Sequence, residues 1–323
     1  MKIRVGIVGY GNVGRGAALA VDAAGDMELV AVFTRRDPEA VKAVIGNVAV
    51  LPIESAESMV DDIDVMILCG GSATDLPEQG PYFASMFNTV DSYDTHAKIP
   101  EYMAKIDAVA IKTTAVISAG WDPGPFSMIR ALAESVLPDG ATYTFWGRGV
   151  SQGHSDAVRR IEGVRHAVQY TIPIESAIDA VRGGTRPVFE ARQKMKRECF
   201  VVAEEDADKG FIEDTIKTMP HYFADYDTTV NFIDIDELEA NHSDMPHGGM
   251  VLRSGNTAAN TQVMEFSLKL ESNPEFTGSI MVAYARAAYR MAKDGLFGAK
   301  TVFDVPLYYL SEKDRDTLIK ELL

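Results

Sequence analysis

Cysteine is scarce in this chain, whose 323 residues include only Cys69 and Cys199. The two lie far apart inside apolar runs and form no Cys-x-x-Cys pair, which is typical of a reducing compartment. We therefore expect two buried thiols. Long apolar runs are also missing: none approaches the roughly 18 residues that a membrane-spanning helix needs, and no signal peptide is recognisable. These absences predict a cytoplasmic protein without a membrane partner.

Basic side chains are outnumbered, with 31 lysines and arginines against 47 aspartates and glutamates and a formal charge of -16. This charge repels phosphate backbones, so we expect no nucleic-acid partner. The six histidines show neither a His-x-x-x-His spacing nor a zinc spacing with cysteine, so no metal is expected. A Gly-x-Ser-x-Gly nucleophile turn is absent too. Metal-dependent hydrolysis and acyl-enzyme chemistry therefore lose support.

The composition that remains is ordinary for a globular protein, with 46% hydrophobic and 24% charged residues and no internal repeat. Because single cores usually stop growing below about 250 to 300 residues, this length predicts two domains. We expect a dinucleotide-binding domain over residues 1–122, completed by C-terminal helices at about 277–323. Residues 123–276 would form a substrate-binding and dimerisation domain.

A glycine turn follows the first β-branched run, Ile3 to Val8, and leads into the helical pattern Ala17 to Ala24. Strand, glycine turn and helix in this order favour nucleotide binding, although such turns also occur without a nucleotide. One glycine makes the tight turn, the second lets the backbone approach a pyrophosphate, and the third lets the helix pack on the strand. The turn reads Gly9-Tyr10-Gly11-Asn12-Val13-Gly14.

The next strand, Leu29 to Phe33, should end where the cofactor ribose lies, and an NAD site usually has an acid there. This chain has Thr34, Arg35 and Arg36 instead. Two guanidiniums suit a 2'-phosphate, which they can grip with charge-assisted hydrogen bonds. The alternative is a solvated surface pair. We expect NADP as the cofactor.

Strands and helices continue to alternate, which predicts an α/β, doubly wound, Rossmann-like parallel sheet with its ligand site beyond the carboxyl ends of the strands. Two loops should meet the cofactor there, unless the first is an ordinary glycine-rich turn. The expected elements are Val48 to Leu51, Val65 to Leu68, Pro77 to Phe87 and Thr89 to Asp91; the loop residues are Cys69, Gly70, Ser72, Ala73, Thr74 and Asp75, then Asp91, Ser92 and Tyr93.

From about Pro123 the alternation breaks down, which suggests a mainly antiparallel sheet in a second, α+β domain. A packing helix over Thr277 to Lys293, stopped at Asp294-Gly295, would return to cover the first domain. The strands expected between them are Thr142 to Trp146, Val168 to Ile174, Glu198 to Ala203 and Thr229 to Ile235.

Two aspartates follow predicted parallel strands and are candidates for chemistry. Asp94 and Asp122 could face the nicotinamide and hold a substrate ammonium, since an amine is the natural partner of two acids. Each could equally be a turn or helix-cap residue, above all Asp122 before Pro123. Arg197, His247 and Asn273 suit a carboxylate or an amino terminus, although singly they could be surface or turn residues.

Six stretches together resemble the meso-diaminopimelate D-dehydrogenases of bacterial lysine biosynthesis, over essentially the whole chain. That resemblance implies a homodimeric NADP enzyme that removes hydride and ammonia from the D-configured end of meso-2,6-diaminopimelate, giving L-2-amino-6-oxopimelate. The stretches are Ser72-Ala73-Thr74-Asp75, Asp91-Ser92-Tyr93-Asp94-Thr95-His96, Gly120-Trp121-Asp122-Pro123-Gly124, Ser151-Gln152-Gly153-His154-Ser155-Asp156-Ala157, Cys199-Phe200-Val201-Val202 and Met245-Pro246-His247-Gly248-Gly249.

The resemblance also implies roles for the candidate residues. Asp94 and Asp122 would engage the reacting amino group, with an aspartate or a water that it holds as proton acceptor. Trp121 and Trp146 would wall the pocket, and Gln152 and Gly153 would contact the neighbouring carboxylate. The distant L-configured end would be held by Thr171, Arg197, His247 and Asn273. Two departures are a slightly shorter His96 to Ala119 stretch and Arg148 on the pocket strand, which bears on tolerance for other D-amino acids.

Two other functions remain open at this point. One is a different two-domain NADP oxidoreductase, acting on a semialdehyde or a D-amino acid. The other is an NADP-binding sensor without catalysis.

Overall fold

The structure is a computed structural model that describes residues 2–323, and the chain forms two compact units. Unit 1 runs to Met128 and resumes with Pro274–Leu323, while unit 2 is Ile129–Asn273. Helix α5 (Pro125–Val136) carries the chain from the first unit into the second. The assignment of a cofactor domain to 1–122 with 277–323, and of a substrate domain to 123–276, stays a prediction.

Unit 1 is built on a seven-stranded sheet in the order β14-β6-β5-β4-β1-β2-β3, in which each strand pair is parallel. The order reverses at β1, so the loops after β1 and β4 leave the sheet side by side. The expected parallel, doubly wound sheet is confirmed. Its strands are β1 (Ile3–Val8), β2 (Met27–Thr34), β3 (Ala49–Pro52), β4 (Val65–Leu68), β5 (Asn88–Asp91), β6 (Thr114–Val116) and β14 (Gly298–Lys300).

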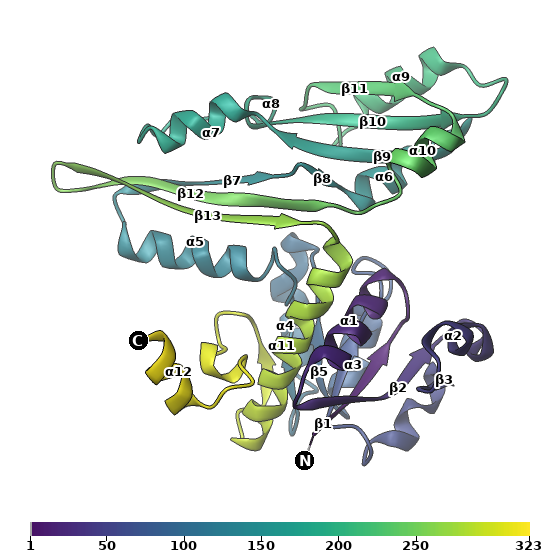
Figure 1. Cartoon of the computed structure of the whole chain (residues 1–323), viewed down its shortest axis with the longest axis vertical. Coiled ribbons are helices and arrows are strands. Elements are labelled where there is room, and N and C mark those ends of the chain that lie inside the picture. The colour runs from purple at the N-terminus through teal and green to yellow at the C-terminus, as the bar shows by residue number, and fades with distance from the viewer. Residues whose placement is uncertain (1) are drawn as a thin grey trace. The chain divides into compact units, whose positions relative to one another are not determined.

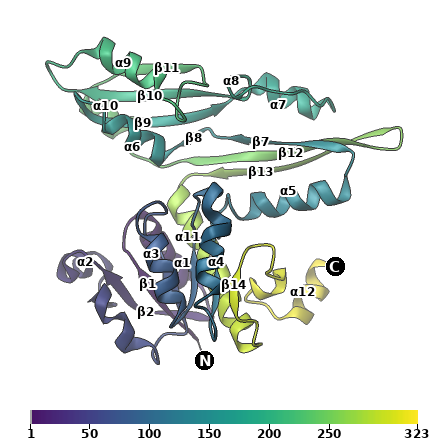
Figure 2. The ribbon, with the colours of Figure 1, turned by 180° about the vertical axis from the view of Figure 1, so that it is seen from behind.

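Both faces of this sheet are covered, because successive strand residues point to opposite sides. Val65 and Ile67 of β4 pack with α1 and α11, whereas Met66 and Leu68 pack with α3 and α4. Figures 1 and 2 show these two helix pairs on opposite sides of the sheet. The helices of unit 1 are α1 (Asn12–Ala23), α2 (Pro38–Ile45), α3 (Leu76–Ala84), α4 (Ile99–Asp107), α11 (Asn273–Lys293) and α12 (Arg315–Leu322), with short 3-10 turns η1 (Ile53–Met59), η2 (His96–Lys98) and η3 (Leu307–Tyr309).

Helix α11 returns to unit 1 as the sequence predicts, but it begins at Asn273 rather than at Thr277. Its end lies where expected: Gly295 has a positive φ of 75°, and the Leu296 amide donates to the Met291 carbonyl at 2.9 Å. Helix α11 crosses α1 at two glycines. A Cβ on Gly278 would lie 2.3 Å from the Ala17 nitrogen, and one on Gly16 would lie 2.5 Å from the Pro274 carbonyl oxygen. The two backbones therefore touch.

Unit 2 holds two sheets rather than the single sheet that we expected. One has the order β11-β10-β9-β8 and the other β13-β12-β7; all pairs are antiparallel except β10 with β11. The long hairpin of β12 and β13 was not expected from the sequence. The strands are β7 (Gly140–Trp146), β8 (Gly149–Val150), β9 (Val164–Pro173), β10 (Met195–Ala203), β11 (Thr228–Phe232), β12 (His247–Thr257) and β13 (Asn260–Leu270).

Helices cover one face of each sheet of unit 2. Val158 of α6 and Ile212 and Ile216 of α9 pack on Cys199 and Val201 of β10. Ile178 and Val181 of α7 pack on Leu252 of β12 instead. The helices are α6 (Gln152–Arg159), α7 (Glu175–Arg182), α8 (Ala191–Lys194), α9 (Lys209–Thr218) and α10 (Ile235–Asn241).

Candidate functional site

The glycine turn after β1 has the backbone that the sequence analysis requires. Gly9 has a φ of +88°, which L side chains rarely adopt. A Cβ on Gly14 would lie 2.1 Å from the Gly9 carbonyl oxygen, so only glycine lets α1 pack this closely. Gly11, the N-cap of α1, faces open space. The N-terminal end of α1 is therefore open to the approach of an anionic group.

A cavity of about 220 Å³ adjoins this turn. Its lining joins the ends of β1, β2 and β4, which the sheet order places together. Nine predicted cofactor residues line it, whereas Asn12, Val13, Ser72, Ala73 and Thr74 do not. The nine are Gly9, Tyr10, Gly11, Thr34, Arg35, Arg36, Cys69, Gly70 and Asp75.

The two arginines lie at this cavity, each in a defined contact. The Arg36 guanidinium donates to the Tyr10 carbonyl, and its amide donates to the Thr34 hydroxyl at 3.0 Å. Arg35 forms an ion pair with Asp75, with 2.9 Å between Nη1 and Oδ1. Asp75 also accepts from the Gly71 amide at 2.9 Å. The arginines therefore join the loop after β2 to the glycine turn and to the loop after β4.

Gln79 is a lining residue that sequence reasoning missed. Its Oε1 is buried and has no hydrogen-bond partner among the described residues. It lies on α3, one turn beyond Asp75, and no motif singles it out.

The loops after β4, β5 and β6 are tied together by two side chains. The Ser72 hydroxyl accepts from the Asp94 amide at 2.9 Å and lies 3.4 Å from the Thr95 hydroxyl. Asp91 accepts from the amides of Tyr93 and Ser118, at 2.9 and 3.0 Å. This places Asp94 beside the cofactor loop and anchors the segment that carries Trp121 and Asp122.

The burial of three predicted residues of unit 1 differs from what the sequence suggests. The side chain of Asp91 is buried and also accepts from the Tyr102 hydroxyl at 2.8 Å, so it braces the loops; its predicted place in the cofactor site stays a prediction. Burial raises the pKa of the Asp91 carboxyl, although its hydrogen bonds oppose this. Tyr93 is buried and stacks on Tyr102, with ring centroids 4.1 Å apart. Cys69 is partly exposed; only Cys199 is a fully buried thiol.

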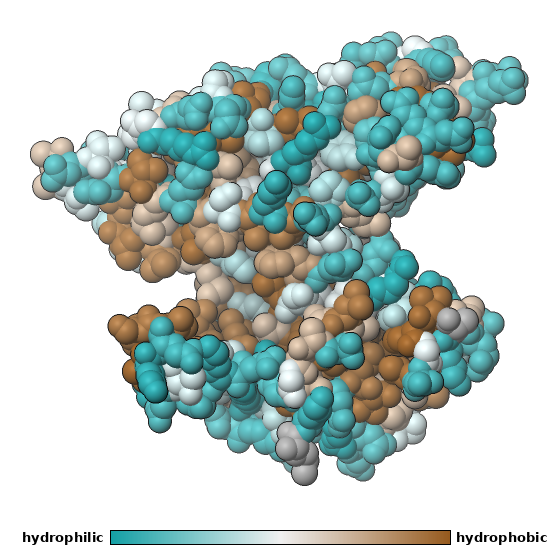
Figure 3. All heavy atoms as spheres, in the orientation of Figure 1, coloured by the Kyte–Doolittle hydropathy of each residue, from teal (hydrophilic) through white to brown (hydrophobic). Residues whose placement is uncertain are grey.

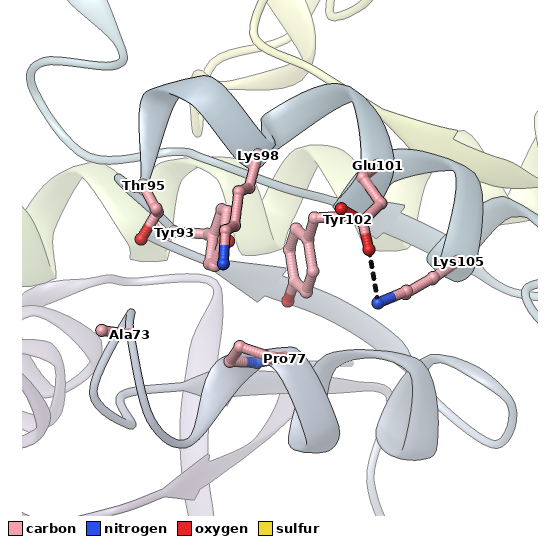
Figure 4. Close-up of a pocket in the computed structure, with 8 residues that line it drawn as sticks. All are labelled: Ala73, Pro77, Tyr93, Thr95, Lys98, Glu101, Tyr102 and Lys105. Atoms are coloured by element: carbon pink, nitrogen blue, oxygen red, sulfur yellow. Dashed lines mark ion pairs between the residues drawn. The ribbon is translucent and has the colours of Figure 1, made fainter.

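A second, smaller cavity of about 150 Å³ lies between the loop after β4 and the η2–α4 segment. Figure 4 shows Ala73 and Pro77 on one side of it, and Thr95 and Lys98 on the other. The Tyr93 and Tyr102 rings also line it, and Glu101 and Lys105, one turn apart on α4, form an ion pair at 2.9 Å on one side of it. Ala73 and Tyr93, both predicted cofactor residues, are thus placed here.

In unit 2, strand register brings together the residues predicted to hold the distant end of the substrate. Arg197 of β10 stands opposite Thr171 of β9, which stands opposite Gly149 of β8. The Arg197 guanidinium donates to the Thr171 hydroxyl and lies over the Tyr226 ring, 4.0 Å from its centroid. Arg197 is 7% exposed, and burial lowers its pKa. A Cβ on Gly149 would lie 2.5 Å from the His247 ring, which fills the space over that glycine.

Two more predicted residues join this group through the segment before β12. The side-chain amide of Gln152 donates to the Met245 sulfur at 3.0 Å. The backbone amide of Asn273 donates to the Met245 carbonyl at 2.9 Å. Trp146 stands opposite Gly249 in the neighbouring sheet. Gly153 is exposed, with open space around it.

Three further residues of unit 2 bear on this group. His154 accompanies the Gln152 motif; burial and the charge of Arg197 lower its pKa to about 4, so it is neutral at physiological pH. Arg148, a departure from the family pattern, pairs with Glu198 at 3.3 Å and lies over Tyr170. The third is Gln169, a fully buried residue of β9 that sequence reasoning did not single out. Over residues 2–323, no cluster of three histidine, cysteine or acidic side chains could hold a metal ion.

Unit 1 has a glycine turn at the switch point of a parallel sheet, with arginines in place of the usual acid. Unit 2 groups a buried arginine with amides and an imidazole. This combination defines a two-domain dehydrogenase that uses a nicotinamide dinucleotide. Residues 120–272 match the model of the diaminopimelic acid dehydrogenase C-terminal domain. Residues 4–72 match the model of the coenzyme F420-dependent NADP oxidoreductases.

Curated relatives are similar along the whole chain. A meso-diaminopimelate D-dehydrogenase of Ureibacillus thermosphaericus is 62% identical, covering 100% of this chain and 99% of the relative. One of Lysinibacillus sphaericus is 63% identical, with 99% of each covered. The chain belongs to the meso-diaminopimelate D-dehydrogenase family, which confirms the resemblance stated above.

Two solved structures show the same fold. A mutant meso-diaminopimelate dehydrogenase of Clostridium tetani E88, crystallised with DAP, has a TM-score of 0.95 and 54% identity over 100% of both chains. An engineered D-amino acid dehydrogenase bound to NADP+ has a TM-score of 0.89 and 43% identity, again over 100% of both.

Proposed function

We propose that this chain catalyses the NADP-dependent, reversible oxidative deamination of the D centre of meso-2,6-diaminopimelate, which yields L-2-amino-6-oxopimelate and ammonia. The observation that carries the proposal is Arg197, a nearly buried cation that forms no ion pair with a carboxylate of the described residues. Such a charge is costly unless it is paired, and a substrate carboxylate is the partner that this enzyme family provides. The relatives' names and the DAP and NADP+ in the solved structures support the same assignment.

The residues present in unit 1 fit NADP. The glycine turn and the first amides of α1 would hold the pyrophosphate, and Arg35 and Arg36 would hold the 2'-phosphate. When bound, the nicotinamide supplies the acceptor for the hydride of the α-carbon. The chain's own residues bind the cofactor and the substrate and orient one against the other.

We further propose the roles of the substrate residues. A substrate ammonium must lose a proton before the hydride leaves, and Asp94 or Asp122, directly or through a water, would accept it. Trp121, Trp146, Gln152 and Gly153 would contact the reacting end. Thr171, Arg197, His247 and Asn273 would hold the distant amino-acid end. Water then adds to the resulting imine, and ammonia leaves.

Turnover by the purified protein tests the proposed function against its two rivals. We expect NADPH absorbance to rise with meso-diaminopimelate and NADP, and to stay flat with the L,L-isomer, which has no D centre. NADPH formation from a semialdehyde alone would favour a different oxidoreductase. NADP binding without turnover of either substrate would favour a sensor.

We also propose that the enzyme is a homodimer and works in the cytoplasm. The family resemblance supports the dimer. The two free cysteines suit a reducing compartment. Over the described residues, no helix is long and apolar enough to span a membrane.

A further inference from the structure

Thr171 and Arg197 form a row of buried polar residues in unit 2, and one further residue of β9 belongs to it. Gln169 lies two positions before Thr171 on β9, on the same face of the strand, and is 0% exposed. Neither atom of its amide has a hydrogen-bond partner among residues 2–323. A buried amide without a partner destabilises a fold, and leucine would fill similar space without that cost. The amide therefore needs a role that packing does not supply.

Arg197 carries a buried hydrogen-bond donor that could pair with this amide. Its Nη1 donates to Thr171, but its Nε is buried and has no partner in the described part of the chain. Because Arg197 stands opposite Thr171 and Cys199 opposite Gln169, Arg197 and Gln169 are diagonal neighbours on one face. Diagonal neighbours on antiparallel strands lie within reach of long side chains. A small rotation of the Gln169 side chain would bring its Oε1, an acceptor, to the Nε–H donor.

The backbone of Gln169 is fixed by the helix that carries Gln152 and Gly153. The backbone amide of Gln169 donates to the Ser155 hydroxyl at 2.9 Å, and its backbone carbonyl accepts from the Ser151 backbone amide at 3.0 Å. Figures 1 and 2 show α6 beside β9. Only the side chain of Gln169 is therefore free to turn toward the guanidinium.

We propose that Gln169 is a positioning residue that acts through Arg197. The Oε1 of Gln169 accepts the Nε–H of Arg197 and so fixes the rotation of the guanidinium. Thr171 already binds one end of that guanidinium, and the Tyr226 ring packs on one of its faces. The remaining N–H groups then meet the distant carboxylate of the substrate in a bidentate geometry. This inference rests on the proposed function, and it makes Gln169 a determinant of selectivity for substrates that carry a second carboxylate.

Gln169→Leu removes the amide and keeps its approximate volume. We expect the melting temperature to change little, because the loss of the hydrogen bond to Arg197 and the removal of a buried amide have opposite effects on stability. KM for meso-diaminopimelate should rise about tenfold while kcat changes less than about twofold, since one hydrogen bond to a charged group is removed. NADP affinity, measured by titration calorimetry, should not change. Cys199→Ala is the matched control, because Cys199 is equally buried and stands directly opposite; it should lower the melting temperature and leave KM unchanged.

A double-mutant cycle shows whether the effect passes through Arg197. In an Arg197→Met background, Gln169→Leu should cause no further loss of kcat/KM, taken from the low-substrate slope. An unchanged KM in Gln169→Leu, or the same loss with and without Arg197, would overturn the inference. If Gln169→Leu does not fold, Gln169→Met takes its place in both measurements. Absence of turnover in the wild type would instead overturn the proposed function, so the two failures are distinguishable.

Discussion

At the scale of single residues, the identity of the cofactor depends on Arg35 and Arg36. Replacing both by alanine should lower the NADP/NAD ratio of kcat/KM by about a hundredfold or more, since each charge-assisted contact is worth about 1.5 to 3 kcal/mol. Steady-state kinetics with both cofactors measures this ratio. Lys42→Ala, an exposed cation on nearby α2, is the control and should leave it unchanged. An unchanged ratio in the double variant would remove the assignment of the 2'-phosphate site.

A second residue-scale prediction concerns the pair of Asp26 with Arg286, whose atoms lie 2.7 Å apart at two contacts. Burial would raise the pKa of Asp26, but the hydrogen bonds and charge of Arg286 outweigh it and lower that pKa. A lowered carboxyl pKa gives stability that is present above the unfolded value of about 4 and is lost as the pH falls through the folded one. Asp26→Asn should therefore cost about 2 to 3 kcal/mol at pH 7 and progressively less below about pH 4.

Chemical denaturation at several pH values measures this loss. Glu213→Gln, which breaks only the exposed pair with Lys217, is the control and should cost less than about 0.5 kcal/mol. A pH-independent difference between wild type and Asp26→Asn would contradict the electrostatic explanation.

Residue roles that depend on local backbone geometry could be predicted from the sequence, whereas roles that depend on burial could not. Gly9 and Gly14 were identified because a strand–turn–helix unit needs them locally. Asp91 follows a strand in the same way, but its contacts to Ser118 and Tyr102 come from distant segments. Gln169 carries no local signal, since its burial depends on segments such as α6 and β10 that pack against β9.

At the scale of elements, the close crossing of α1 and α11 predicts a sharp effect of one methyl group. Gly278→Ala would place a Cβ 2.3 Å from the Ala17 nitrogen, so the helices must separate. We expect a loss of about 1 to 3 kcal/mol in stability. NADP binding should also weaken, because α1 carries the glycine turn at its N-terminus.

Thermal melting and NADP titration measure the two effects. Gly210→Ala in α9 is the control, since its nearest atom would lie 3.3 Å away; it should be neutral or stabilising. Unchanged melting and binding in Gly278→Ala would show that the helices adjust without consequence.

Elements with a strong periodic pattern were predicted, and the β12–β13 hairpin was missed for a physical reason. Its two-residue turn is Ala258-Ala259, and Ala258 adopts a φ of 52° without glycine or asparagine. Such a turn lacks the sequence signal of a hairpin. The row of Arg197, Thr171 and Gly149 was also out of reach, because strand register is set by pairing between distant segments.

At the scale of the whole molecule, we predict a homodimer. Hydrophilic side chains cover much of the displayed face, and apolar ones gather at several places on it, the C-terminal segment among them (Figure 3). In the C-terminal segment, Phe303, Leu307 and Leu322 are each more than half exposed. Monomeric proteins seldom leave groups of apolar residues exposed in this way. Sedimentation at micromolar concentration should give about twice the chain mass of 35.2 kDa. A single species at the chain mass would remove the prediction.

Unit 1 is interrupted in the chain by unit 2, and this order matters while the protein is being made. The strand β14 and the helix α11, which complete the sheet edge and cover α1, leave the ribosome only after unit 2 has been translated. Until then the nascent chain exposes the apolar residues of α1 and the edge of β6. Unit 2, which is continuous, can fold first, although it is encoded second. We therefore expect unit 1 to complete its folding last during synthesis.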